Sequence, residues 1–165
     1  MEQKEPRSLT PLEAYARLTA RCATAEHCLA EVRDWLRRWH VEANAIEPLL
    51  QRLVEERYID ETRYCRAFVR DKARFAHWGK YKIAQALAMK RIPESIYRPL
   101  LNQLDDEEDY LNTLRRLIEA KQRTLKAGTP YERKAKLIRF ALGRGYSMED
   151  ISQIIPDFEE NEADE

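Results

Sequence analysis

Apolar residues along the chain recur with the 3.6-residue period of an α-helix, and no useful stretch shows the strict alternation of a β-strand. The clearest example is the segment 62–76. The apolar residues on one side of its helical wheel are Tyr64, Cys65, Phe68, Phe75 and Ala76. Other helices are expected to begin near Pro11, Ala25, Ala43, Gly79, Pro93, Glu107, Tyr131 and Ser147. The pattern predicts an all-α fold without a sheet.

One apolar pattern occurs three times, with its members separated by steps of 4, 5, 5 and 4 residues. The three copies are Val32, Leu36, Val41, Ile46 and Leu50; Ile83, Leu87, Ile92, Tyr97 and Leu101; and Leu137, Ala141, Tyr146, Ile151 and Ile155. A step of four is about one helical turn, and a step of five crosses the break between two helices. Another amphipathic helix precedes each copy and carries Tyr15, Tyr64 or Tyr110. The chain is therefore predicted to contain three tandem three-helix repeats.

The expected division of the chain follows from this pattern. It comprises a flexible N-terminus (1–9), repeat 1 (10–59), repeat 2 (60–104), repeat 3 (105–156) and an acidic tail (157–165). A repeat of this size has a marginal core, so neighbouring repeats are expected to support one another. The alternative is a chance recurrence in an ordinary helical chain, but the same four steps in three places favour true repeats.

Charge is balanced over the whole chain but not along it. The 165 residues contain 29 Lys and Arg against 29 Asp and Glu. The segment 60–104 alone has 10 basic and 4 acidic residues, a net charge of +6, whereas 1–59 carries −1 and 105–165 carries −5. The middle repeat is therefore the one that favours an anionic partner.

Arginines form a stripe on the polar side of the segment 62–76, at Arg63, Arg66, Arg70 and Arg74, with Lys72 nearby. Lys80, Tyr81 and Lys82 follow, next to Trp78 and Gly79. Like charges on one helix face repel one another mildly without a partner, so we interpret these cations, with Tyr81, as a contact surface for nucleic acid or an acidic protein. The alternative is a solvated helix face with the aromatic rings packed in the corner between two helices.

A second basic cluster lies in repeat 3. Its members are Arg133, Lys134, Lys136, Arg139 and Arg144. They fall mainly on the exposed face of a helix whose other face carries Leu137 and Ala141, and we take them as secondary contact candidates.

Motifs for catalysis are missing from the sequence. There is no phosphate-binding loop, HExxH or GxSxG, and the acidic run 105–109 lacks the spacing of a calcium loop. That run is better interpreted as the start of a helix, where acidic residues favour the positive end of the helix dipole. Cys22, Cys28 and Cys65 are odd in number and lack CxxC spacing, so we expect reduced, buried thiols. The sequence predicts a protein that is not an enzyme and binds no metal or cofactor.

No apolar run is long enough to span a membrane, and the first eleven residues lack the apolar core of a signal peptide. We therefore expect a cytoplasmic protein, acting as a monomer.

The segment 53–64, LVEERYIDETRY, followed by Phe68 and Arg74, resembles the central signature of the RecX family of regulatory proteins. The resemblance continues through Gly79-Lys80-Tyr81-Lys82-Ile83, Leu87 and Lys90-Arg91-Ile92, and it ends with Arg144-Gly145-Tyr146-Ser147 and Ile151. With the N-terminal segment 11–18, it covers about residues 10–155. Arg91 is a departure, because the family often has glycine there. That difference puts the left-handed helix cap that glycine favours in question.

The resemblance implies an elongated, curved array of three three-helix repeats that lies in the groove of the RecA–DNA filament. It implies a regulator that limits RecA's ATP hydrolysis, strand exchange and coprotease activity, and so modulates recombination, DNA repair and the SOS response. Direct contact with single- or double-stranded DNA is expected to be weak and salt-sensitive. Two alternatives remain open from the residues themselves: an autonomous DNA-binding protein with helix-turn-helix-like units, and a helical scaffold with protein partners alone.

Overall fold

All regular structure in the computed structural model, which describes residues 7–126 and 128–156, is helical. The helices are α1 (Pro11–Cys22), α2 (Leu29–Arg38), α3 (Ala43–Glu55), α4 (Glu61–Arg74), α5 (Lys80–Met89), α6 (Glu94–Gln103), α7 (Glu108–Thr124), α8 (Pro130–Gly143) and α9 (Met148–Ile154), with a 3₁₀ turn at Leu104–Asp106 before α7. The predicted all-α class is confirmed. The expected acidic tail, and most of the expected flexible N-terminus, lie outside the described residues.

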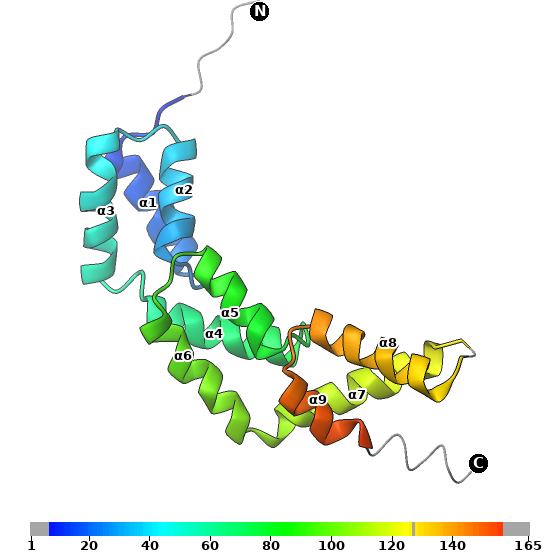
Figure 1. The fold of residues 1–165 in the computed structure, drawn as a ribbon. Helices are drawn as coiled ribbons and strands as arrows, with labels where there is room; N and C mark the ends of the chain where they lie inside the picture. Colours follow the sequence, from blue (N-terminus) through cyan, green and yellow to red (C-terminus); the bar gives the residue numbers. More distant parts are fainter. Residues whose placement is uncertain (1–6, 127, 157–165) are drawn as a thin grey trace, which may run out of the picture.

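Helices follow one another in groups of three, and the groups form an elongated, bent array (Figure 1). The second helix of each group (α2, α5 and α8) lies on the inner side of the bend. The third helix (α3, α6 and α9) lies on the outer side. The prediction of three tandem three-helix repeats in a curved array is therefore confirmed.

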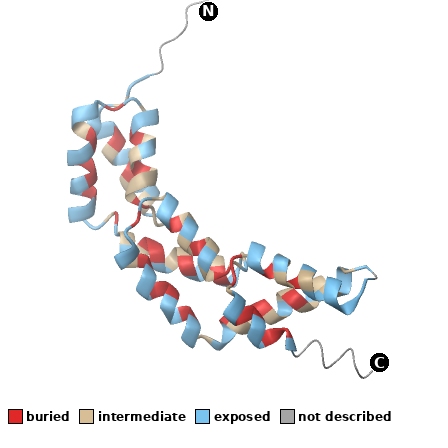
Figure 2. Cartoon of the chain, in the orientation of Figure 1, coloured by how far each residue is buried: buried red, intermediate tan, exposed pale blue. Residues whose placement is uncertain are grey.

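The apolar pattern marks the core of each repeat. All fifteen residues of its three copies are buried, from Val32 at 0% exposure to Ile46 at 8%. Buried residues lie along the facing sides of the helices and exposed ones lie outward (Figure 2). Because the spacing of each copy places these side chains on one face of two successive helices, burial of that face folds the pair together.

The turn between the second and third helices has the same left-handed cap in all three repeats. The residues with positive φ at this position are His40 (53°), Arg91 (58°) and Gly145 (97°). In each repeat the next residue donates its N–H to the carbonyl five positions back: Val41 to Leu36 (3.1 Å), Ile92 to Leu87 (3.3 Å) and Tyr146 to Ala141 (3.2 Å). This is the Schellman arrangement. Arg91 adopts the left-handed conformation without being glycine, which answers the question that its side chain raised.

Helix α2 begins at Leu29, so the predicted start near Ala25 is wrong. The physical reason lies in the next repeat. The Leu29 N–H donates to the Glu61 carboxylate (3.2 Å), while the N-cap residue Cys28 supplies no side-chain hydrogen bond. A helix start that depends on a partner 32 residues away leaves no local signal.

Helix α4 ends at Arg74, and the expectation that Phe75 belongs to its buried face is also wrong, since that ring is 77% exposed. Val69 and Ala73 continue the buried face instead. Beyond Arg74 the chain turns back, and the Trp78 N–H donates to the Lys72 carbonyl (2.9 Å). That turn, rather than the helical period, decides where the Phe75 ring points.

Repeats 2 and 3 share one continuous apolar core, which also includes Cys28 of repeat 1. The other buried apolar residues of repeat 1, from Ala14 to Ile59, form a separate cluster. The two junctions between repeats therefore differ, because apolar packing dominates one and polar contacts contribute strongly to the other.

At the junction of repeats 1 and 2, Glu31 of α2 is the central polar group. Its carboxylate accepts hydrogen bonds from the Tyr64 hydroxyl (3.0 Å) and the Lys90 ammonium group (2.7 Å), both in repeat 2. His27 Nδ1 lies 3.1 Å from its other oxygen. One carboxylate of repeat 1 thus binds a side chain of α4 and the side chain that follows the end of α5.

At the junction of repeats 2 and 3, the N-terminus of α5 meets the turn between α8 and α9. The Gly79 N–H donates to the Arg144 carbonyl (2.8 Å), and the Tyr81 N–H donates to the Gly145 carbonyl (3.0 Å). The Lys80 N–H donates to the Tyr110 hydroxyl (2.9 Å). The free N–H groups of one helix end are therefore satisfied by the following repeat.

Candidate interaction surface on the second repeat

Three of the four stripe arginines line one groove between α4 and α6. Arg66, Arg70 and Arg74 border a cavity of about 200 Å³. Its apolar residues are Val69, Ala73, Leu100 and Leu104. The arginine spacing predicted by the helical period thus corresponds to a real surface feature. The contribution of α6 was not predicted, because no sequence signal pairs α4 with α6.

These three guanidinium groups are exposed and only lightly engaged. Arg70 pairs with its neighbour Asp71 (3.3 Å), and Arg74 approaches Glu107 at 3.9 Å. Exposed pairs of this kind contribute about 0–1 kcal/mol each and exchange readily for a better partner. A phosphate or carboxylate entering the groove would meet cations above an apolar floor.

Arg63, the first arginine of the stripe, has a different environment. Its guanidinium pairs with Glu26 of repeat 1 (2.5 Å) and donates to the Arg57 carbonyl (3.1 Å). These contacts hold Arg63 at the junction of repeats 1 and 2. The structure therefore separates Arg63 from the three groove arginines, although all four fall in one stripe of the helical period.

Lys72 and Lys82 both lie against the Trp78 ring. Each ammonium nitrogen is 4.6 Å from the Trp78 ring centre, and Lys72 is also 5.4 Å from the Phe68 ring centre. Cation–π attraction of this kind positions both lysines at the corner between α4 and α5. Trp78 is half-buried, whereas Tyr81 is 67% exposed.

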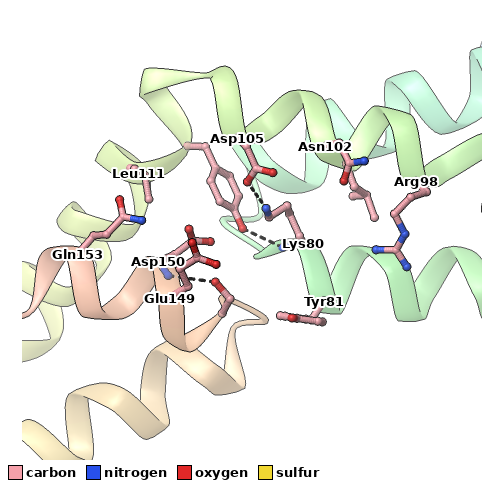
Figure 3. A pocket seen from close by; sticks show the side chains of 12 residues that line it. Lys80, Tyr81, Arg98, Asn102, Asp105, Leu111, Glu149, Asp150 and Gln153 are labelled. Atoms are coloured by element: carbon pink, nitrogen blue, oxygen red, sulfur yellow. Dashed lines mark hydrogen bonds and ion pairs between the residues drawn. The ribbon is translucent and has the colours of Figure 1, made fainter.

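Lys80 faces a pocket of about 330 Å³ between repeats 2 and 3 (Figure 3). Its ammonium group forms an ion pair with Asp105, from the acidic run before α7. Arg98, Glu149 and Asp150 also line this pocket, so its charge is mixed. Helix α7 begins at Glu108, with acidic residues in its first turn as expected for that run. The pocket acids on α9 were not predicted as site residues.

The buried Tyr110 lines this pocket, and the buried Tyr146 packs against it. Burial raises the pKa of Tyr146 to about 12 and moves the pKa of Tyr110 well above its ordinary value. Their ring centres lie 5.3 Å apart, where Tyr110 of α7 meets Tyr146 in the turn between α8 and α9. Both hydroxyls therefore stay protonated at neutral pH.

The secondary candidates in repeat 3 do not form one free cationic patch. The Arg144 guanidinium donates to the Ala76 carbonyl of repeat 2 (2.9 Å), and Arg139 donates to the Ala135 carbonyl of its own helix (3.4 Å). Arg133 and Lys134 also have interactions within the chain. Lys136 lies exposed on α8.

Within residues 7–126 and 128–156, no group of three or more His, Cys, Asp or Glu side chains is placed to hold a metal ion. Over the same residues, no helix combines the length and the apolar character needed to cross a membrane.

The fold and this surface define a tandem three-helix repeat protein with a cationic middle unit. Residues 60–98 match the family model for the second three-helix domain of RecX, and residues 107–155 match the model for its third. The two matches together span more than half of the chain. The chain belongs to the RecX family, as the sequence resemblance predicted.

Individual relatives agree with this assignment. The regulatory protein RecX of Vibrio parahaemolyticus is 29% identical over 92% of this chain and 93% of its own length. That of Halalkalibacterium halodurans is 32% identical over 77% of this chain, which spans only about half (47%) of that longer protein.

Solved structures share the fold. The crystal structure of RecX from Lactobacillus salivarius superposes with a TM-score of 0.80 at 19% identity, covering 90% of this chain and 96% of that one. Another RecX crystal structure gives a TM-score of 0.81 at 21% identity, covering 88% and 73%.

Proposed function

We propose that this protein is a non-enzymatic regulator that binds the RecA–DNA filament and inhibits RecA's ATPase, strand-exchange and coprotease activities. In this way it would modulate recombination, DNA repair and the SOS response, acting in the cytoplasm as a monomer. Membership of a family of regulatory proteins supports the regulatory role. The observation that carries the contact is the groove between α4 and α6, lined by Arg66, Arg70 and Arg74.

The groove suits an anionic partner because its cations are exposed and its floor is apolar. Guanidinium groups bind carboxylates and phosphates through paired N–H donors, and their apolar surroundings strengthen each contact relative to open water. The groove belongs to the middle repeat of an elongated array (Figure 1), and an elongated shape is suited to binding along a filament. We propose that repeat 2 (60–104) supplies the main contact, and that repeats 1 (10–59) and 3 (105–156) extend it.

The experiment is an ATPase titration with RecA assembled on single-stranded DNA. Near-stoichiometric protein is expected to inhibit ATP hydrolysis. The variant Arg66→Ala/Arg70→Ala/Arg74→Ala is expected to require on the order of tenfold more protein, and its filament binding should depend less on salt.

The matched control removes three exposed positive charges from repeat 3, in the variant Arg116→Ala/Arg123→Ala/Lys126→Ala. It should inhibit like the wild type, because these residues lie on and just after α7, outside the groove and outside the basic cluster at 133–144 that is the contact candidate of repeat 3. No inhibition by the wild-type protein at any ratio near stoichiometric would reject the proposed function. Equal losses in both variants would reject the groove as the contact.

A second candidate function is direct DNA binding by helix-turn-helix-like units. The observation that favours it is the short turn between α5, which ends at Met89, and α6, which begins at Glu94. A mobility-shift titration without RecA separates the two. Tight, sequence-selective binding would support this candidate, whereas weak, salt-sensitive binding supports the filament regulator.

A further inference from the structure

Repeat 1 carries alternating arginine and tryptophan side chains between α1 and α2. The Arg17 guanidinium carbon lies 4.9 Å from the Trp39 ring centre. That of Arg21 lies 5.0 Å from Trp39 and 4.5 Å from Trp35. The two indole rings are nearly parallel, with an interplanar angle of 18° and centres 6.3 Å apart. His27 ends the row, with its ring 4.8 Å from Trp35 and edge-on to it. We call this row the Arg/Trp ladder.

A cationic pocket continues the Arg/Trp ladder past Trp39. Its volume is about 300 Å³, and Arg7, Arg17 and Arg38 line it together with Trp39. Among the described residues of this lining, Glu13 is the acidic one, and it approaches Arg7 at 3.9 Å. The described lining thus has three guanidinium groups and one carboxylate. The pairing of Arg38 with Asp34 (3.0 Å) still leaves Arg17, beside Trp39, without an acidic partner within residues 7–126 and 128–156.

We infer that the Arg/Trp ladder and this pocket form a binding site for single-stranded nucleic acid. Indole faces stack on nucleobases of any sequence, and neighbouring arginines neutralise the phosphates. Both groups lie side by side here: the indoles of Trp35, on α2, and of Trp39, which caps its end, are half-buried, and the arginines are exposed. This site shares no residue with the groove of repeat 2, so it is separate from the contact that the proposed function assigns to Arg66, Arg70 and Arg74.

The present cation–π contacts do not prevent stacking on the indoles. Arg17 and Arg21 are exposed, so water screens the attraction of their guanidinium groups to the half-buried indoles, whereas a stacked base covers the same face with a larger apolar surface. A base can therefore replace Arg17 or Arg21 over the indole. The displaced guanidinium remains within reach of the phosphate on the same nucleotide, so both interactions are kept.

An acidic peptide is the weaker occupant on these observations. Carboxylates would pair with the arginines but would leave both indole faces without a planar partner. The pocket between Arg17, Arg38 and Trp39 instead places cations and an aromatic face around one volume. A nucleotide has both the anionic and the planar group that this arrangement matches.

The test is a titration with a short oligothymidylate, followed by intrinsic fluorescence in the Trp78→Phe protein, without RecA. The sequence has three tryptophans, so this variant confines the signal to Trp35 and Trp39. Binding is expected to quench the fluorescence. In Arg17→Gln/Arg21→Gln on the same background, the affinity should fall on the order of tenfold, and the slope of log K against log salt should fall by about 1.4, or about 0.7 for each lost phosphate contact.

A second variant keeps the test informative if loss of the ladder arginines unfolds repeat 1. Arg38→Gln changes a residue that lines the pocket but lies outside the Arg/Trp ladder, where it pairs only across one helical turn with Asp34. It should weaken binding severalfold while the melting curve stays the same. The matched control, Arg116→Gln on the exposed side of α7, should bind like its parent.

Absence of quenching at low salt would overturn the inference, as would equal affinities for Arg38→Gln and Arg116→Gln. Quenching by poly-glutamate but not by the oligonucleotide would overturn it in favour of an acidic protein partner. Because RecA takes no part, failure here leaves the ATPase result unaffected, and failure of RecA inhibition leaves this site unaffected.

Discussion

The main chains of Gly79 and Gly145 are in direct contact at the junction of repeats 2 and 3. A Cβ atom on Gly79 would lie 2.3 Å from the carbonyl carbon of Gly145, and a Cβ atom on Gly145 would lie 2.4 Å from the Cβ atom of Lys82. This approach lets the N-terminus of α5 donate its N–H groups to the turn before α9. The two glycines thus join the repeats through backbone hydrogen bonds as well as through the shared core.

Gly79→Ala is expected to destabilise the protein by about 1–3 kcal/mol, because the new methyl group meets backbone atoms that have no freedom to rotate away. Urea unfolding followed by circular dichroism measures the loss. The matched control is Gly143→Ala, where the added methyl has no neighbour within 4 Å. That change at the end of α8 should be neutral or stabilising by up to about 1 kcal/mol. Equal effects of the two substitutions would contradict the close main-chain contact.

Arg91→Gly is expected to stabilise the protein by about 0.5–1 kcal/mol, since glycine adopts the left-handed conformation without the steric cost that a side chain adds. The φ angle of Arg91 is 58°. Thermal and urea unfolding provide the measurement. Arg91→Ala separates loss of the charge from the effect of glycine and should give no such gain; a stabilisation shared by both variants would point to the charge instead.

The junction of repeats 1 and 2 is expected to weaken in acid through Glu31. Burial alone would raise the pKa of this carboxyl, but hydrogen bonds outweigh burial and hold the pKa below its ordinary value. The donors are Lys90, His27 and Tyr64. Because the folded-state pKa is depressed, the stabilisation is present above the unfolded pKa and is lost as the pH falls through the folded one.

Glu31→Gln is therefore expected to cost about 1–3 kcal/mol at neutral pH, since Lys90 and Tyr64 lose their charged acceptor. The difference between wild type and variant should shrink as the pH falls from about 6 to about 3. Urea unfolding at a series of pH values measures it. Burial raises the pKa of Glu61 at the same junction, so protonation of Glu61 affects stability in the opposite direction. The effect of Glu31 is therefore taken from the difference in unfolding free energy between wild type and variant, in which the contribution of Glu61 cancels. A difference that stays constant with pH would rule out the titration of Glu31 as its source.

Thiol labelling of the folded protein is expected to modify Cys22 well before Cys28 and Cys65. Cys22 is half-buried, whereas the other two side chains are buried. Burial raises the pKa of all three thiols, that of Cys65 to about 11, so access of the reagent to the sulfur sets the order. Labelling rates with a thiol reagent, assigned by peptide mass, give the order. Rapid labelling of Cys65 in the native state would show that the junction opens readily.

Much of the fold was predictable because its determinants are local. The three copies of the apolar pattern, from Val32 to Ile155, identified the buried face of each helix pair, since helical period and burial act on neighbouring residues. The same period aligned Arg66, Arg70 and Arg74, and the structure places them along one groove. Membership of the RecX family was visible in the sequence for the same reason, because its signature is a run of adjacent residues.

What the tertiary structure alone decided depends on contacts between residues far apart in the chain. Glu61 sets the start of α2, Glu26 draws Arg63 away from the groove arginines, and the turn at Trp78 exposes Phe75. In repeat 1, whose summed charge is close to neutral, packing of α1 and α2 on α3 places Arg21 over Trp35. Sequence periodicity determines which face of a helix is buried. The partner that covers or contacts the other face is set by packing between repeats, and no local pattern contains that information.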